Sequence, residues 1–129
     1  MNEILVPISP GELLDKITIL RIKSERMSDP AKVANVRREL DALESTWADS
    51  AYGTAAIDAE VAALMAVNAR LWTIEDEIRD KERARSFDAE FIRLARAVYV
   101  ENDERAAIKR RINLQLGSRM IEEKSYKAY

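Results

Sequence analysis

Residues 91–116 read FIRLARAVYVENDERAAIKRRINLQL, and apolar side chains recur in this stretch every three or four residues. That spacing places one side chain per turn on the same face of an α-helix. Three polar residues interrupt the stripe where a core should continue: Asn102, Arg105 and Lys109. An unpaired charge inside a bundle destabilises a small domain by several kcal/mol. The stretch therefore predicts a long core helix whose inner face meets either counter-charges or a polar pocket.

The rest of the chain predicts three more helices. Ala, Leu, Glu, Arg and Lys are abundant, whereas the 129 residues include only three glycines and three prolines. This composition is typical of helical proteins. We expect an all-α, antiparallel four-helix bundle, a single domain of residues 1–129 with a short N-terminal arm and a C-terminal tail. The expected helices span residues 10–27, 30–50, 55–84 and 88–116.

Each expected helix begins after a residue that can cap it. Ser9 precedes a proline, and Glu12, three residues later, completes a capping box. Asp29 also stands directly before a proline. Thr54 is the expected cap of the third helix and Asp88 that of the fourth. The third and fourth helices are joined by a short connection, so they should lie antiparallel.

The first helix is apolar on most of its sides, which predicts a central position in the bundle. In helical projection, Asp15 falls between Ile19 and Ile22. We therefore expect the carboxylate of Asp15 to be buried together with these two apolar side chains.

The third helix carries a polar stripe about 100° from its apolar seam. The stripe consists of Asn68, Trp72, Glu75, Arg79 and Glu82. An antiparallel register brings Trp72 level with Tyr99, and Asn68 level with Asn102 or Asp103. The stripe should then face the polar interruption of the last helix. The candidate counter-charges for Arg79, Arg105 and Lys109 are Glu75, Glu82 and Asp15.

Composition excludes several classes of chemistry. The absence of cysteine and histidine removes disulfides, thiol chemistry, the usual zinc sites and any imidazole base. A net charge of −2 argues against general nucleic-acid binding. No apolar run approaches the roughly 20 residues of a membrane span. We expect a cytoplasmic protein without cofactor or dedicated metal site.

Two interpretations of the polar cluster stay open. It is either a buried network that fixes helix register, or a pocket that receives a small anionic ligand, since arginine and lysine suit phosphate and carboxylate. The pocket would make the chain a binding module, or else an enzyme acting on a phosphorylated or carboxylated metabolite, with Glu75 as acid or base. Catalytic roles stay unassigned. The candidate ligand-binding residues are Asp15, Lys16, Asn68, Trp72, Glu75, Arg79, Tyr99, Asn102, Arg105 and Lys109.

A magnesium-dependent alternative rests on the acidic residues of the third helix. All-α nucleotide pyrophosphohydrolases hold magnesium with paired Glu-x-x-Glu and Glu-x-x-Asp motifs on neighbouring helices. The spacing of Glu77 and Asp80 is similar to the second motif, but the chain lacks the matching first one. Acidic residues on a helix face are usually solvated, so we assign no metal ligand.

Three segments resemble an uncharacterised bacterial family of short all-helical proteins, classed as a domain of unknown function. They are PISPGEL with DKITIL (residues 7–20), LWTIEDEIR (residues 71–79) and EEKSY (residues 122–126). The resemblance implies no activity, but it marks Asp15, Lys16, Trp72, Glu75 and Arg79 as motif positions. It also implies that the tail docks on the bundle. Apolar surface left over on the long helices predicts self-association, as a homodimer.

Overall fold

The computed structural model describes residues 2–129, and the chain is an all-α four-helix bundle, as predicted. None of residues 2–129 lies in a β-strand. The helices are α1 (Pro10–Arg26), α2 (Pro30–Asp49), α3 (Asp58–Arg83) and α4 (Ala89–Gln115). The bounds of α1, α2 and α4 agree with the sequence to within one residue at each end.

Three of the predicted caps are confirmed. Ser9 Oγ accepts a hydrogen bond from the backbone N–H of Glu12 at 3.2 Å. The carboxylate of Asp29 caps α2, and Asp88 Oδ1 accepts from the N–H of Phe91 at 3.0 Å. Each cap satisfies an N–H group that the first turn of a helix leaves without an internal partner.

The predicted cap at Thr54 is wrong. The chain after α2 forms hydrogen-bonded turns, in which the N–H of Gly53 bonds the carbonyl of Ser50 and that of Ala55 bonds the carbonyl of Tyr52. Helix α3 begins only at Asp58, and no side chain caps it. The first turn of α3 instead carries Asp58 and Glu60, whose negative charges interact favourably with the positive end of the helix dipole.

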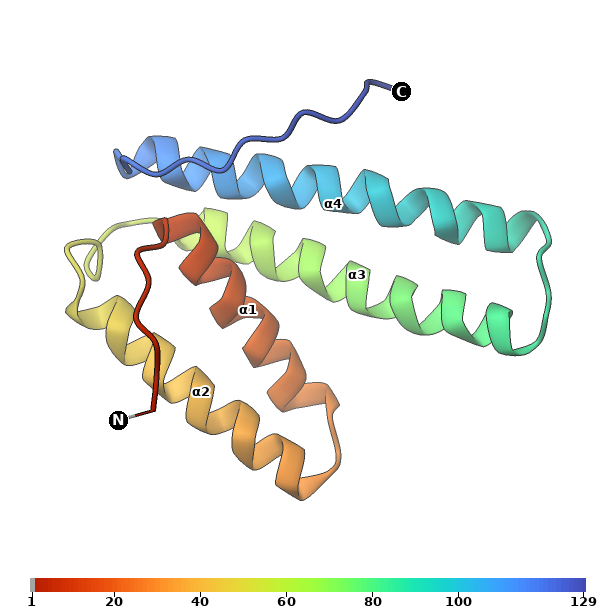
Figure 1. Cartoon of the computed structure of the whole chain (residues 1–129), viewed down its shortest axis with the longest axis horizontal. Coiled ribbons are helices and arrows are strands. Elements are labelled where there is room, and N and C mark those ends of the chain that lie inside the picture. Colours follow the sequence, from red (N-terminus) through yellow and green to blue (C-terminus); the bar gives the residue numbers. More distant parts are fainter. Residues whose placement is uncertain (1) are drawn as a thin grey trace.

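Helix α1 is central, as its apolar sides predicted (Figure 1). It packs against all three other helices, while α2 packs against α1 and α3 pairs with α4. Figure 1 shows two hairpins, α1–α2 and the longer α3–α4, whose far end extends beyond α1. The buried core lies where α1 meets the others and includes Leu13, Leu14, Ile17, Leu20, Val36, Leu40, Leu64, Val67, Ile108 and Ile112.

The register of α3 against α4 is the predicted one. Arg70 Nε lies 2.9 Å from Glu101 Oε2, and at the other end of the pair Arg111 Nη2 lies 3.3 Å from Glu60 Oε2. These ion pairs place Trp72 level with Tyr99 along the hairpin. The polar stripe of α3 and the polar interruption of α4 therefore lie at the same height.

The C-terminal tail, residues 118–129, docks on α4. Gly117 adopts φ +68°, which turns the chain back, and the N–H of Ser118 bonds the carbonyl of Asn113 at 2.9 Å. The tail then runs along α4 towards the middle of that helix (Figure 1). Arg110 holds Glu123 at 3.0 Å, and the hydroxyl of Tyr129 donates to Asp103 at 2.5 Å. The expectation of a docked tail is confirmed.

The apolar side chains of the N-terminal arm are largely exposed. Ile4 is 89% and Leu5 87% exposed. Within residues 2–129, no helix has the length and apolar content that crossing a membrane demands.

Candidate functional site

The centre of the candidate site is an ion pair between α1 and α4. The side chain of Asp15 is 1% exposed, and its two carboxylate oxygens receive Nε and Nη2 of Arg105 at 2.9 and 2.5 Å. A two-point contact of this kind fixes the plane of the guanidinium. Pairing with Asp15 raises the pKa of Arg105, against the lowering effect of burial. Arg105 is therefore charged and held in one orientation.

Asn68 of α3 joins the same carboxylate. Its Nδ2 donates to Asp15 Oδ1 and to Thr18 Oγ1, both at 3.0 Å. The hydroxyl of Thr18 donates its own proton to the carbonyl of Asp15 at 2.8 Å, so Thr18 Oγ1 acts as an acceptor towards Asn68. Both neighbours of Nδ2 are acceptors, which fixes the orientation of the amide. Asn68 Oδ1 then points away from Asp15 and receives no hydrogen bond from residues 2–129.

Lys109 makes a second ion cluster one turn further along α4. The residue is 8% exposed, and its Nζ lies 2.8 Å from both Glu12 Oε2 and Glu122 Oε2. Burial lowers the pKa of Lys109, but the hydrogen bonds with the two glutamates outweigh it and raise that pKa. Lys109 thus ties the start of α1 and the tail to α4.

The expected counter-charges are confirmed in part. Glu75 and Glu82 do not neutralise Arg105 or Lys109. Helix α1 supplies both counter-charges, Asp15 for Arg105, as expected, and Glu12 for Lys109. Glu75 pairs with Arg79 on its own helix, which was also expected. The capping box at Ser9 is also incomplete, since the carboxylate of Glu12 bonds Lys109 rather than the backbone. A buried ammonium is a stronger partner for a carboxylate than a neutral N–H.

Glu122 connects the tail electrostatically to this cluster. Hydrogen bonds from Lys109, and then from Lys124 at 3.0 Å, lower the pKa of Glu122 from 4.5 to about 2. The carboxylate is ionised at neutral pH and holds the first half of the tail in place.

The predicted single pocket is divided into two cavities by Asn102 and Arg105, which line both. The first, here called the tail cavity, lies between α4 and the tail and has a volume of about 690 Å³. The second, the bundle cavity, lies among α1, α3 and α4 and has a volume of about 390 Å³. Both volumes fall in the range of small-molecule sites.

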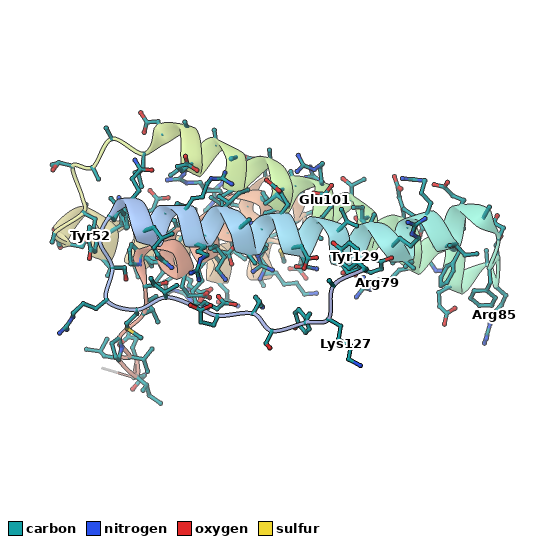
Figure 2. The ribbon with its side chains drawn as sticks, turned by 90° about the horizontal axis from the view of Figure 1, so that it is seen from above. Tyr52, Arg79, Arg85, Glu101, Lys127 and Tyr129 are labelled. Atoms are coloured by element: carbon teal, nitrogen blue, oxygen red, sulfur yellow. The ribbon has the colours of Figure 1, made fainter. Side chains whose placement is uncertain are left out.

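Aromatic and charged side chains from α4 and the tail line the tail cavity. The rings of Tyr99 and Tyr129 meet edge to face, with centroids 5.1 Å apart. Figure 2 shows the tail following α4, with Tyr129 turned towards the helix and Lys127 pointing away from it. Three cationic residues, Arg105, Lys109 and Lys124, also line this cavity. The tail thus forms one wall of this cavity.

The bundle cavity has a different character, because one side is apolar. Ile19, Ile22 and Leu71 line it together with the half-buried Trp72. The polar lining comes from Asn68, Asn102 and Arg105 and from a charged group made of Lys23, Glu75, Asp76 and Arg79. Trp72 and Tyr99 are level along the hairpin but belong to different cavities.

The structure brings nine of the ten predicted site residues to these two cavities or to the ion pair between them, and Lys16 is the exception. Its side chain is half exposed and lies 3.8 Å from Glu12. Consecutive residues on a helix point about 100° apart, so burying Asp15 turns Lys16 towards solvent. Lys16 remains a motif position without a place in either cavity.

Sequence reasoning missed two groups that complete the site, Glu12 and Glu122. Glu12 was interpreted as a cap, and Glu122 was noted only as part of the EEKSY segment. Among residues 2–129 no three His, Cys, Asp or Glu side chains gather in a way that could hold a metal ion. Glu77 and Asp80, considered for magnesium, are both exposed.

The chain belongs to a family of unknown function (DUF6165), whose family model matches residues 4–129. No curated protein and no solved structure matches it. The family description assigns no activity, so function has to be inferred from the geometry of the two cavities.

Proposed function

We propose that this member of the family is a binding module whose tail cavity receives a small phosphorylated or carboxylated molecule. The observation that carries the proposal is the fixed guanidinium of Arg105. Nε and Nη2 hold Asp15, and Nη1 makes only a 3.4 Å contact with Asn102 Oδ1. An arginine has five N–H donors, so some N–H groups of Arg105 remain available to a ligand in the tail cavity. A planar donor that is already immobilised loses little entropy when an anion binds.

The surroundings of Arg105 support an anionic ligand of modest size. Lys109 uses two of its three N–H groups on Glu12 and Glu122. Lys124 adds a second ammonium on the tail side of the cavity. The tyrosine rings offer apolar faces to the uncharged part of a ligand. Together these groups favour a molecule that combines an anionic group with a less polar body.

The competing interpretation is that the ion pairs serve only to hold the helices and the tail together. Asp15–Arg105 and Lys109–Glu12 do connect α1 with α4, and such contacts fix register. A register device, however, requires no space beside it. Ligand binding distinguishes the two interpretations, because a molecule that binds only the folded state raises the melting temperature.

Arg105→Lys tests the proposal, with Arg111→Lys as the matched control. Both arginines lie on α4 and pair with an acid of another helix, but Arg111 lines neither cavity. The probes are pyrophosphate, citrate and a series of sugar phosphates and nucleotides, followed by melting temperature and calorimetric titration. We expect at least one probe to bind wild type and Arg111→Lys equally. Arg105→Lys should bind it about tenfold more weakly, since lysine cannot hold Asp15 and the anion in one plane.

Two results would contradict the proposal. One is that no probe stabilises the wild-type protein, and the other is that Arg105→Lys binds as tightly as wild type. A second pair of variants locates the site. Lys124→Gln removes a cavity ammonium and should weaken binding about threefold, whereas Lys32→Gln removes an exposed ammonium on α2 and should have no effect.

The enzymatic alternatives have less support from geometry. Glu75, the expected acid or base, is engaged with Arg79 and lies in the bundle cavity rather than the tail cavity. Magnesium-dependent nucleotide hydrolysis would need a cluster of acidic ligands that residues 2–129 do not form. A cytoplasmic location and self-association stay predictions.

A further inference from the structure

We infer that the bundle cavity is a second binding site, for α-hydroxy or α-amino acids with an apolar side chain. The first observation is the unused acceptor Asn68 Oδ1. Asn68 is 6% exposed and lines the bundle cavity, and both protons of its Nδ2 are committed to Asp15 and Thr18. Within residues 2–129, every fully buried side-chain nitrogen or oxygen has a hydrogen-bond partner. Oδ1 has none, so it must border open space, and the bundle cavity is the space that Asn68 lines.

The second observation is that an anion-binding donor lies beside this acceptor. Asn68 Nδ2 and Arg105 Nε both bond the same oxygen, Asp15 Oδ1, at 3.0 and 2.9 Å. The amide and the guanidinium are therefore neighbours, and both line the bundle cavity. Arg79 supplies a further guanidinium in the lining. A ligand that satisfies Asn68 and Arg105 together must present a hydrogen-bond donor next to an anionic group.

A carboxylate with a hydroxyl or ammonium group on its α-carbon has this arrangement. A simple carboxylate lacks it, because an ionised carboxylate only accepts hydrogen bonds and leaves Asn68 Oδ1 without a partner. A buried acceptor left unpaired on binding reduces affinity. Adjacent acceptor and donor groups in the cavity thus select for the α-substituent.

The apolar lining determines the rest of the ligand. Ile19, Ile22, Leu71 and Trp72 offer aliphatic and aromatic surface, which suits an apolar side chain. The cavity of about 390 Å³ lies near the lower limit for ligand sites, so the ligand is small. Glu75 and Asp76 in the same lining favour an α-ammonium, whereas a hydroxyl suits Asn68 alone.

Three probes with the same ring and carboxylate test this inference: phenyllactate, phenylalanine and 3-phenylpropanoate. Binding is followed by NMR in the full chain, from the indole N–H of Trp72 and the side-chain amide of Asn68. Trp47 is an internal control, because it stacks on Tyr52 at 6.1 Å and lines neither cavity. We expect phenyllactate or phenylalanine to shift the Trp72 and Asn68 signals and to leave Trp47 unchanged. 3-Phenylpropanoate should bind at least about tenfold more weakly.

The comparison of the two α-substituted probes identifies the donor. Tighter binding of phenylalanine indicates an ammonium, and tighter binding of phenyllactate indicates a hydroxyl. Equal binding of all three probes would show that Asn68 Oδ1 does not contact the ligand. Failure of both α-substituted probes to shift Trp72 would overturn the assignment of this ligand class.

Arg79→Gln and Arg83→Gln form a matched pair of variants for the same site. Both arginines are exposed on α3 and pair with an acid of their own helix, but only Arg79 lines the bundle cavity. We expect Arg79→Gln to weaken binding about fivefold and Arg83→Gln to leave it unchanged. Lys124→Gln, which affects the tail cavity, should not alter the response of Trp72. Although Arg105 lines both cavities, these variants separate a failure in the bundle cavity from a failure in the tail cavity.

Discussion

At Gly11, the backbone of α1 lies close to the backbone of α4. The N–H of Gly11 donates to Asn113 Oδ1 at 2.8 Å, and both residues are buried. A Cβ atom on Gly11 would lie 2.6 Å from the carbonyl oxygen of Lys109 and 2.9 Å from Asn113 Oδ1. Only a glycine allows this approach, which in turn brings Glu12 to Lys109.

We predict that Gly11→Ala lowers the free energy of unfolding by about 1–3 kcal/mol, because the methyl group meets backbone that cannot yield. Urea denaturation measures the change as a lower midpoint. Gly117→Ala is the control: nothing lies within 4 Å of the added methyl, but φ is +68°. Its cost should be about 1 kcal/mol, from the left-handed conformation alone. A smaller loss for Gly11→Ala than for Gly117→Ala would show that α1 and α4 separate easily.

The pair of Asp15 and Arg105 yields a second prediction at this scale. Arg105→Met leaves the carboxylate of Asp15 charged at 1% exposure, and we expect it to destabilise the protein by about 3–5 kcal/mol. Adding Asp15→Asn removes the unpaired charge and should recover most of that loss. The test is a double-mutant cycle in urea. Additive effects of the two substitutions would mean that the pair is not coupled in the folded protein.

At the scale of the elements, the tail is held to the bundle by charge. Glu122 has a pKa lowered to about 2 by Lys109 and Lys124. Because the folded pKa lies below the usual 4.5, ionised Glu122 favours the docked tail fully above about pH 4.5. That contribution is lost as the pH falls from 4.5 towards 2. Asp88, which caps α4, also titrates near 2, but it lies at the α3–α4 connection, away from the tail.

We predict that the tail leaves α4 in this acidic window. Backbone amide signals of residues 119–126 should shift with a midpoint near the pKa of Glu122, which is about 2. In Glu122→Gln this titration should be missing from the tail, whereas signals around Asp88 should still titrate. Retention of the tail titration in Glu122→Gln would assign the docking to other groups, such as Arg110 with Glu123.

How far sequence could predict each element depends on how local its determinants are. Helix bounds and three caps were predictable because apolar spacing and capping act within a few residues. Asp15 could be placed in the core because it falls between Ile19 and Ile22 in helical projection. Thr54 failed as a cap because the choice between turn and helix at residues 51–57 depends on packing across the bundle.

The partners in the site were harder to predict than the buried charges. A stripe shows that Arg105 and Lys109 face inward, but it does not show which helix lies opposite. The carboxylates arrive from α1 and from the tail, far away in the sequence. The division into two cavities was unpredictable for the same reason, since it depends on the direction in which Arg105 extends once Asp15 holds it.

At the scale of the whole molecule, two charged side chains, Asp15 and Lys109, are buried in ion pairs, whereas part of the apolar surface is left outside. The arm exposes Ile4 at 89%, Leu5 at 87% and Val6 at 66%. The projecting end of the α3–α4 hairpin exposes Phe87 and Ile92, at 54% and 56%. Contiguous apolar surface on a protein marks an interaction site more often than isolated side chains do.

We predict that a second copy of the chain covers the arm, so that the protein sediments as a dimer. Deleting residues 2–6 should give a monomer, because those side chains make up the exposed apolar part of the arm. It should not lower the melting temperature measured at low protein concentration, since the arm adds nothing to the core of its own subunit. A full-length variant with Ile4, Leu5 and Val6 changed to serine controls for chain length and should behave like the deletion. A wild-type protein that sediments as a monomer at every concentration would contradict the prediction. A deletion variant that remains dimeric would show that the interface lies elsewhere, such as at the exposed end of the α3–α4 hairpin.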